Sequence, residues 1–455
     1  MVEGAGVVEE LEKLFPGKVT RNVSSYLVDW WPIFWIDPGA KGEALAGIKP
    51  ANIEDIVKLV RFSSSTGIQI CVRGGGSSVT GASVPTGGVV LDMRGLNQIL
   101  DLDEGNRSVT VQVGITLEEL ENKLNAKGFT LSQVPQSFDQ ATIGGFISTF
   151  GSGQFSTLYG GVEDSVLRLE VVLPSGEVTW TRRRGSPRSS MGPELSRLFI
   201  GGEGSFGIIT AAELKIRRLP RYVWKMVYGF SSYENAINEC RNLLEFDVKP
   251  AACRVYNETE ALFQFGEQKC IALLVYHFGS KEVMDVITAQ VAAEMSQKAE
   301  TMEPRLVDVW LGRRFNYREE IENLKKTGYM PETVEIGAKW SRLYELYLEV
   351  MRRFKDREGV AGIGAHVSHL YDQGACMYFT FLMKPDVNVY RNIWSTMAEV
   401  ARLHDATISH HHGVGALKYE YLQEEVPVSI IESLKRALDP ERILQQPRSF
   451  RWAKS

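Results

Sequence analysis

With 455 residues, the chain is too long for one compact core and predicts two or three domains of about 150 residues each. Its 44% hydrophobic and 24% charged residues are typical of a folded soluble protein rather than a disordered one. A formal net charge of −5 argues against nucleic acid as the main partner, because neutralising phosphates requires a basic surface.

The cysteines and the start of the chain indicate a reducing compartment. The cysteines are odd in number and lack CxxC spacing, so they support neither a disulfide framework nor a zinc ribbon. The start lacks the features of a signal peptide and no apolar run is long enough for a membrane span, so we expect a cytoplasmic protein. The aromatic segment 26–38 (YLVDWWPIFWIDP) predicts core or domain-interface packing, with peripheral membrane contact as the alternative.

The first half of the chain combines short strands with amphipathic helices. Asn52 predicts a helix N-cap before the apolar period of residues 53–60. Strand patterns at 68–73, 87–96 and 108–114 precede an amphipathic helix at 115–128. Segments 167–176 and 177–181, joined by Pro-Ser-Gly, predict a β-hairpin.

The second half alternates longer helices with strands. Helical periods cover 231–246, 281–300, 385–404 and 428–443, and strand patterns cover 254–257, 270–278 and 375–383. We therefore predict an α+β first domain at 1–220 and an α/β cap domain at 221–415. A helical C-terminal segment at 416–455 is expected to return to the first domain.

Three glycine-rich segments carry the first chemical signal. Residues 73–81 (RGGGSSVTG) follow a strand, and their backbone N–H groups can converge on an anion, although a plain turn is an equal alternative. Residues 135–161 add many glycines and hydroxyls. Residues 202–207 (GEGSFG) match GxGxxG, but a strand pattern follows instead of a helix, which argues against a Rossmann site. Together the segments predict a large phosphate-bearing cofactor held by loops.

The second signal is the run Ser-His-His-His-Gly-Val-Gly at 409–415. On an extended stretch, neighbouring side chains point to opposite faces, so at most His410 and His412 are expected to share one side. A zinc site would need His366 or His369 as a further ligand. General acid–base catalysis and phosphate binding are the other functional interpretations. The alternative without a function is that the histidines form a polar segment on the surface.

In this order, 73–81, ATIGG (141–145), YGGVEDSV (159–166), the PSGEV hairpin and GEGSFGIIT resemble the FAD domain of the vanillyl-alcohol oxidase / p-cresol methylhydroxylase superfamily. Within it, the histidine run, YDQGACMYF (371–379) and RVYN (254–257) are most similar to the alkyldihydroxyacetonephosphate (alkylglycerone-phosphate) synthases. The resemblance implies a two-domain flavoprotein with a PCMH-type FAD-binding domain at 1–220, a substrate-binding cap and a helical tail.

The resemblance also implies roles for individual residues. Tyr378, His410, His411 and His412 would serve catalysis, Arg254 and, more loosely, Arg318 would bind the substrate phosphate, and no metal is implied. FAD would be non-covalent, because no histidine or cysteine occupies residues 73–82. The residues implied for cofactor binding are Arg73, Gly74, Gly75, Gly76, Ser77, Ser78, Thr80, Gly81, Pro135, Ser137, Asp139, Ala141, Thr142, Gly144, Gly145, Ser148, Glu203, Gly204, Gly207 and Ile209.

Two functions follow as expectations. In the first, implied by the resemblance, a fatty alcohol replaces the acyl group of acyl-dihydroxyacetone phosphate through an adduct at flavin N5, as in ether-lipid synthesis. In the second, the same scaffold oxidises a 2-hydroxy acid or polyol phosphate, passing a hydride to the flavin. Either way we expect a phosphorylated, small or lipid-like substrate and a homodimer. A short segment after Gly266 and the absence of a long N-terminal extension depart from the synthase pattern.

Overall fold

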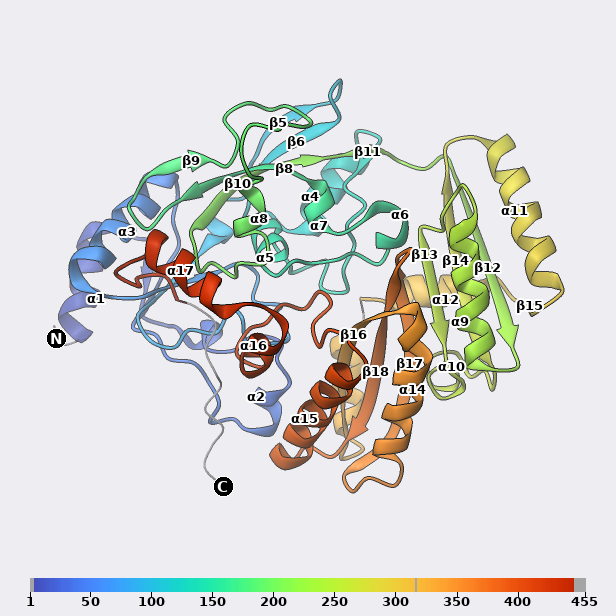
Figure 1. The fold of residues 1–455 in the computed structure, drawn as a ribbon. Helices are drawn as coiled ribbons and strands as arrows, with labels where there is room; N and C mark the ends of the chain where they lie inside the picture. The colour runs from blue at the N-terminus through green and yellow to red at the C-terminus, as the bar shows by residue number, and fades with distance from the viewer. Residues whose placement is uncertain (1–3, 316, 446–455) are drawn as a thin grey trace.

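The computed structural model describes residues 4–315 and 317–445, with the side chains of 4–5 and 317–320 outside the description. Two lobes share the chain (Figure 1). The first lobe holds two main β-sheets, and the second, here called the cap, holds one large sheet covered by helices.

The first sheet of the first lobe has the order β1-β2-β4-β3. Strands β2 (Ala46–Ile48), β4 (Val89–Asp92) and β3 (Ile70–Arg73) are parallel, and β1 (Val19–Thr20) pairs antiparallel with β2. Helix α3 (Ile53–Thr66) connects β2 to β3. The Asn52 side chain accepts a hydrogen bond from the Asp55 N–H at 3.0 Å, so the predicted N-cap is confirmed. Helix α1 (Gly4–Leu14) precedes β1.

The second sheet is antiparallel, with the order β5-β6-β10-β8-β9. Its strands are β5 (Ile99–Asp103), β6 (Ser108–Gln112), β8 (Val166–Val172), β9 (Val178–Trp180) and β10 (Ile208–Lys215). The β8–β9 pair confirms the predicted hairpin, and β10 directly after the third glycine segment confirms that no Rossmann helix follows it. Helices α4 (Leu117–Asn125), α5 (Ile143–Ser148), α6 (Ser156–Tyr159), α7 (Val162–Ser165) and α8 (Ser196–Phe199), and the pair β7 (Phe129–Thr130) and β11 (Arg217–Arg218), complete the lobe.

The cap sheet is antiparallel throughout, in the order β15-β12-β14-β13-β17-β18-β16. Its strands are β12 (Tyr222–Phe230), β13 (Ala252–Tyr256), β14 (Cys270–Phe278), β15 (Glu300–Met302), β16 (Met330–Lys339), β17 (Val360–Leu370) and β18 (Gly374–Met383). Its helices are α9 (Tyr233–Asn242), α10 (Glu258–Phe265), α11 (Lys281–Ser296), α12 (Arg305–Arg313), α13 (Tyr317–Lys325), α14 (Trp340–Phe354) and α15 (Val387–Leu403).

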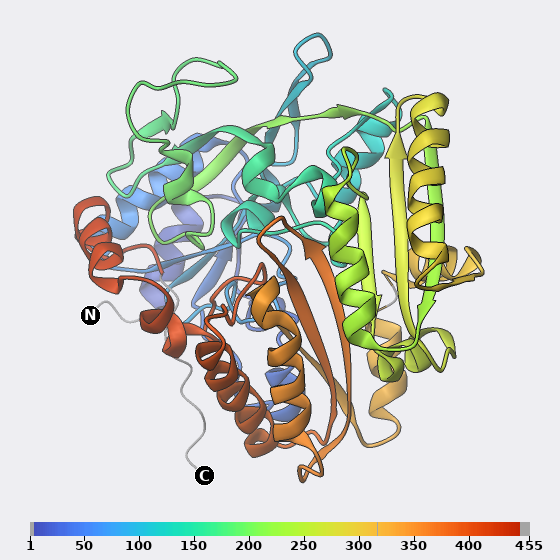
Figure 2. The same cartoon turned by 45° about the vertical axis from the view of Figure 1, so that its right-hand side comes forward.

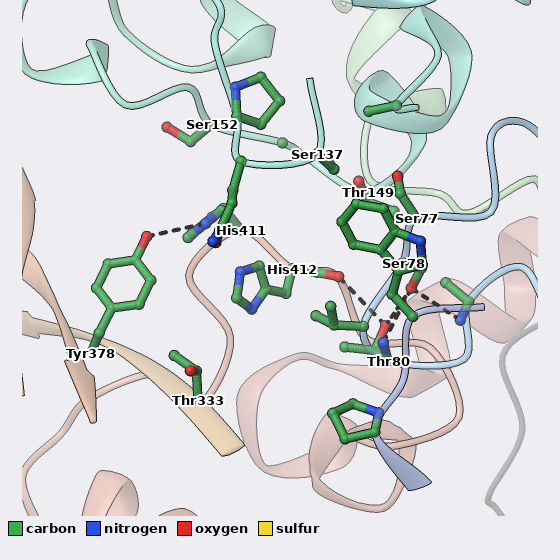
Figure 3. A pocket seen from close by; sticks show the side chains of 18 of the residues that line it. Ser77, Ser78, Thr80, Ser137, Thr149, Ser152, Thr333, Tyr378, His411 and His412 are labelled. Atoms are coloured by element: carbon green, nitrogen blue, oxygen red, sulfur yellow. Dashed lines mark hydrogen bonds between the residues drawn. The ribbon is translucent and has the colours of Figure 1, made fainter. Parts of the chain in front are cut away.

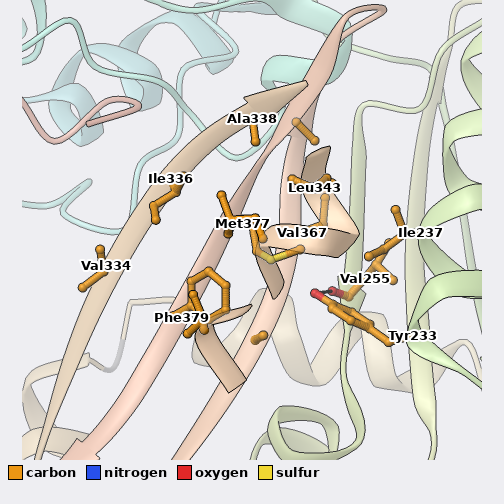
Figure 4. Packing of buried hydrophobic residues seen from close by; sticks show 14 of the residues in the cluster. Tyr233, Ile237, Val255, Val334, Ile336, Ala338, Leu343, Val367, Met377 and Phe379 are labelled. Carbon is orange, nitrogen blue, oxygen red and sulfur yellow. Dashed lines mark hydrogen bonds between the residues drawn. The ribbon is translucent and has the colours of Figure 1, made fainter. Parts of the chain in front are cut away.

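Alternation along the strands gives the cap sheet two different faces. On one face Val334, Ile336, Val367, Met377 and Phe379 are fully or almost fully buried against the helices (Figure 4). The residues between them point the other way, toward the first lobe. Burying this apolar face holds the polar face in a fixed position.

The C-terminal part of the described chain returns to the first lobe. After α16 (Leu422–Glu425), helix α17 (Val428–Leu438) lies beside the first lobe in Figure 1, and in the turned view of Figure 2 it remains far from α11 at the outer edge of the cap. The Gln445 N–H donates to the Ile70 carbonyl, and the buried Lys435 ammonium donates to the Ser205 carbonyl. The tail therefore joins β3 and the third glycine segment.

The aromatic segment near the N-terminus connects the lobes. Helix α2 (Ile33–Ile36) and the preceding Trp31 pack into the hydrophobic core of the cap, and the Trp31 indole donates to the Tyr390 hydroxyl at 2.8 Å. The predicted core or interface packing is thus confirmed for Trp31. Within the described ranges, no helix combines the length and the apolar character that crossing a membrane requires.

Candidate active site

A cavity of about 480 Å³ lies between the glycine segments of the first lobe and the polar face of the cap sheet. Figure 3 shows Ser77, Ser78 and Thr80 on one side and Tyr378 and Thr333 on the other, with His411 and His412 between them. The three segments predicted from glycine content, far apart in the sequence, all contribute to its lining.

The wall of the first lobe is made of backbone. A Cβ atom on Gly75 would lie 1.8 Å from the Gln140 carbonyl oxygen, and one on Gly74 would lie 2.2 Å from Thr142 Oγ1. The loop after β3 is therefore packed directly on the segment that begins α5, and glycine is required for this close approach.

Arg73 supports this loop from behind. Its guanidinium, 6% exposed, donates to the backbone carbonyls of Tyr26, Val28 and Ser83 and occupies the space where a Gly76 side chain would stand. Arg73 therefore holds the glycine loop in shape, and its direct contact with the cofactor stays a prediction.

Glu203 connects the third glycine segment to the histidine run. The residue has a left-handed φ of 46°, and its half-buried carboxylate accepts hydrogen bonds from the backbone N–H groups of Val414 and Gly415 at 2.8 and 3.0 Å. Burial raises the pKa of this carboxyl to about 7, and the backbone donors oppose the rise.

The cap wall is made of side chains placed by strand register. Tyr378 on β18 lies opposite Glu335 on β16 and opposite His366 on β17, and His366 lies opposite Tyr256 on β13. Arg254, two residues before Tyr256, has its guanidinium in the same row. Four neighbouring strands thus bring together residues that span 125 positions of the sequence, from Arg254 to Tyr378.

The Tyr378 hydroxyl lies between two histidines. It is 2.8 Å from His369 Nε2 and 3.2 Å from His411 Nε2 (the His411 contact is dashed in Figure 3). Burial raises the pKa of Tyr378 well above its usual value, with Cys376 adding to the rise and Arg254 opposing it. Burial, helped by neighbouring histidines, lowers the pKa of His369 and His411 well below the ordinary range. Neutral imidazoles are therefore available as proton acceptors.

A chain of hydrogen bonds with a defined donor and acceptor at each step holds Arg254 in place. It donates to the Tyr256 hydroxyl at 2.7 Å and to His366 Nε2 at 2.6 Å. Because arginine only donates, His366 Nε2 must accept, and His366 Nδ1 donates to Glu260 Oε1 at 2.7 Å. Burial lowers the pKa of His366, which agrees with a neutral ring.

The three consecutive histidines do not alternate as predicted, and that expectation is corrected. Residues 410–412 form a bend, so His410 Nδ1 and His411 Nδ1 face each other at 2.9 Å, and the rings of His411 and His412 are 4.4 Å apart. His412 pairs with the buried Glu335 at 3.0 Å, and the Lys418 ammonium binds the other Glu335 oxygen at 2.7 Å. His411 and His412 line the cavity, whereas His410 lines a second one.

Comparisons with known proteins fit this arrangement. The FAD binding domain family matches residues 44–182, and the FAD linked oxidases, C-terminal domain family matches residues 219–446. The uncharacterised FAD-linked oxidoreductase YgcU of Escherichia coli (strain K12) is 30% identical over 429 residues, covering 88% of this chain and 87% of that protein. The chain belongs to the FAD-linked oxidases.

Other proteins similar to this chain are named for different activities. An alkyldihydroxyacetonephosphate synthase of Dictyostelium discoideum is 27% identical over 440 residues, covering 87% of this chain and 71% of that protein. The glycolate oxidase subunit GlcD of Bacillus subtilis is 26% identical over 443 residues, covering 89% and 88%. A solved alkyldihydroxyacetonephosphate synthase structure superposes with a TM-score of 0.81 at 23% identity, covering 98% of this chain and 85% of that one. The resemblance and the two-domain fold predicted from the sequence are confirmed.

The residues of the first wall fit the FAD of this family, because loop backbone without side chains is what cradles the phosphates of a dinucleotide. The cavity lining includes these predicted cofactor residues: Gly74, Gly75, Gly76, Ser77, Ser78, Thr80, Pro135, Ser137, Ala141, Thr142, Gly144, Gly145, Ser148, Glu203, Gly204, Gly207 and Ile209. Their individual contacts with FAD stay predictions. Of the other described residues predicted for FAD, Arg73 lies behind the loop, Gly81 packs on Trp31, and Asp139 is exposed.

The alternative zinc site with His366 or His369 is not favoured in this oxidase. His366 binds Arg254 and Glu260, and His369 binds Tyr378 and Ser156. A different group, Cys376 with His410 and His411, has its candidate ligand atoms within 4.8 Å of one another.

Sequence reasoning missed several side chains of the site. Glu335 and Lys418 fix His412, and Arg314 lines the cavity with its Nε and Nη1 atoms buried without a hydrogen-bond partner in the described structure. For Arg314, the only signal in the sequence is its position four residues before the predicted Arg318. Arg318 itself belongs to α13, but its side chain lies outside the described residues.

Proposed function

We propose that this FAD-linked oxidase is an alkyldihydroxyacetonephosphate synthase-like enzyme, which exchanges the acyl group of acyl-dihydroxyacetone phosphate for a fatty alcohol. The reaction yields the alkyl ether, a carboxylate and one proton, without net oxidation. The observation that carries the proposal is the Tyr378 hydroxyl, held between two neutral histidines beside the half-buried cation of Arg254.

The cap residues suit the proton steps of such an exchange. Tyr378 would take a proton from the carbon next to the substrate carbonyl while His411 accepts the phenolic proton. Because the two transfers occur together, no buried tyrosinate anion has to form. His369 would hold the Tyr378 oxygen in place. When bound, FAD supplies an electrophilic ring that accepts an electron pair or a hydride.

Arg254 supports recognition of a phosphate. Its bonds to Tyr256 and His366 fix the guanidinium plane at the cavity wall, which favours an anion with two acceptor oxygens. The arginine contributes a charge that remains at any physiological pH.

An apolar entrance supports a lipid-like substrate. Phe263 and Phe265 on α10 line the cavity, and Phe263 is 62% exposed beside the half-exposed Leu262. Large apolar side chains that are exposed around a cavity are typical of binding surfaces for apolar ligands. The predicted homodimer, peripheral membrane contact and cytoplasmic location stay predictions.

A second candidate is the oxidation of a 2-hydroxy acid or polyol phosphate. It is favoured by the histidine at the Tyr378 hydroxyl, which can take an alcohol proton as readily as a carbon proton, and by relatives such as the glycolate oxidase subunit. Arg254 would then clamp a carboxylate or a phosphate.

One set of assays separates the two functions. The FAD-loaded protein is incubated without oxygen, first with acyl-dihydroxyacetone phosphate and hexadecanol and then with a panel of 2-hydroxy acids and polyol phosphates. The proposal predicts an ether product with the oxidised flavin band, at roughly 450 nm, unchanged at the end of turnover. Bleaching of that band by a hydroxy acid, without ether formation from the first mixture, would establish the second candidate instead.

A further inference from the structure

A line of hydrogen bonds runs from Tyr378 to a second cavity. The Tyr378 hydroxyl meets His411 Nε2 at 3.2 Å, and His411 Nδ1 meets His410 Nδ1 at 2.9 Å. His410 Nε2 then meets the Tyr371 hydroxyl at 2.9 Å. Each imidazole is contacted through both of its nitrogens, one on either side.

The outer end of the line lies near the surface. The second cavity, of about 620 Å³, is lined by Tyr371 and His410 and by the exposed side chains of Lys339, Arg402 and Asp405. Tyr371 is 37% exposed, whereas Tyr378 is 8% exposed. The line therefore joins the buried end of the catalytic cavity to a cavity with exposed walls.

The proton positions along the line are restricted by chemistry. Between the facing Nδ1 atoms of His410 and His411, one atom must carry a hydrogen and the other must not. If Tyr378 donates to His411, then His411 donates to His410 and His410 donates to Tyr371. The opposite direction is the only other consistent arrangement of the neutral line, and moving one proton along it changes one into the other.

Burial favours the neutral form of both imidazoles in the line. Burial lowers the pKa of His410 to about 4, Glu335 opposes the fall, and His412 and Lys418 add to it. Burial also lowers the pKa of His411. At neutral pH each ring then has one donor and one acceptor nitrogen, as proton relay requires.

The other partner of Tyr378, His369, is held by buried serines of the first lobe. His369 Nδ1 meets the Ser156 hydroxyl at 2.5 Å and the Ser152 hydroxyl at 3.3 Å. These contacts fix the position of the Tyr378 oxygen.

We propose that His410 and Tyr371 form the outer half of a proton relay that carries the proton released in catalysis from Tyr378 to water in the second cavity. The inference rests on the proposed function only in needing a reaction that releases a proton, and both candidate reactions release one. Tyr378 takes the substrate proton and gives its own to His411 Nε2. His411 releases its Nδ1 proton to His410, His410 its Nε2 proton to Tyr371, and Tyr371 its hydroxyl proton to water, with no change in electron count.

The kinetic test uses the FAD-loaded full chain with whichever substrate it turns over. Tyr371→Phe and His410→Ala each break the line outside the catalytic cavity. Turnover should fall at least about tenfold, toward the roughly 10²-fold to 10⁴-fold loss that follows when a proton-transfer group is removed. The solvent deuterium isotope effect on turnover should rise, and imidazole added to His410→Ala should restore turnover with increasing concentration. Tyr421→Phe, which changes the same second cavity outside the line, should leave all three quantities unchanged.

A second measurement does not depend on turnover. NMR of the FAD-loaded protein labelled with ¹⁵N-histidine should show His410 and His411 as neutral rings at pH 7, each with one protonated nitrogen, and Tyr371→Phe should shift the His410 Nε2 signal while Tyr421→Phe does not. If no tested substrate is converted, the proposed function fails and these spectra still decide the relay.

Three results would overturn the relay. One is turnover of Tyr371→Phe and His410→Ala within twofold of the parent enzyme and independent of buffer concentration. Another is a doubly protonated His410 at pH 7. The third is a stoichiometric metal ion on Cys376, His410 and His411 whose removal by a chelator abolishes activity, since metal-bound nitrogens cannot pass protons.

Discussion

The two walls of the cavity are built by opposite means. The first lobe offers backbone: Gly74 and Gly75 touch the neighbouring segment so closely that a methyl group would collide. The cap offers side chains, with Tyr378, Arg254 and Glu335 aligned by strand register. The difference indicates a division of labour, in which the backbone wall holds the cofactor and the titratable wall supplies charge and protons to the substrate.

The largest effect is expected for Tyr378→Phe, which removes a hydroxyl from the cap wall. Turnover should fall about 10²-fold to 10⁴-fold, because the proton-transfer group is lost. The flavin-to-protein absorbance ratio should equal that of the parent enzyme. A variant that loses its flavin together with its activity would show that the cap wall also holds the cofactor.

The backbone wall is tested by Gly75→Ala. The added methyl group would lie 1.8 Å from the Gln140 carbonyl oxygen, so the loop must shift. Overpacking of this kind costs about 1–3 kcal/mol, which corresponds to roughly tenfold to hundredfold weaker FAD binding. FAD titration of the apoprotein measures this. Gly312→Ala, where the methyl group meets open space, is the matched control, and equal FAD affinity in the two variants would contradict the account.

Arg254→Lys tests whether the half-buried guanidinium of Arg254 recognises an anion through two parallel hydrogen bonds. Lysine keeps the charge but cannot bind Tyr256, His366 and a phosphate in one plane, so kcat/KM for a phosphorylated substrate should fall about tenfold, the loss of one charge-assisted hydrogen bond. FAD content should stay constant. Arg305→Lys, at an exposed position, should have no effect, and unchanged kcat/KM in Arg254→Lys would remove it from substrate binding.

The last prediction concerns how the stability of the protein changes with pH. Burial raises the pKa of the cap residue Glu332 to about 8, although Trp394 and Tyr390 donate to it. The protonated Glu332 carboxyl therefore contributes fully to the free energy of unfolding below the unfolded pKa of about 4.3, and this contribution is lost as the pH rises to about 8. The loss is at most about 1.4 kcal/mol per pH unit. Melting temperatures should therefore fall less between pH 5 and pH 8 in Glu332→Gln, and parallel profiles would contradict the raised pKa.

The two walls also differ in how far the sequence predicts them. Glycine clusters reveal the first wall because only glycine permits such close backbone contact. They do not reveal the direction of a side chain such as Arg73, which depends on the path of the loop. For the cap, residue types identified Tyr378, Arg254 and the histidines. Their partners Glu335 and Lys418 were missed because the patterns do not predict β16 and β17, and pairing between strands distant in sequence has no local signal. The bend at His410–His412 depends on contacts with Glu203 and Glu335, and the residues next to the histidines in the sequence do not indicate these contacts.

The central claim is tested most directly by a double-variant cycle on the cap wall, with Tyr378→Phe, His411→Ala and the combination measured for turnover and flavin content. If the two residues transfer protons as one unit, the double variant should be scarcely slower than the slower single variant and should carry as much FAD as the parent enzyme. Losses that multiply, or a double variant without flavin, would contradict the separation of cofactor binding from proton transfer.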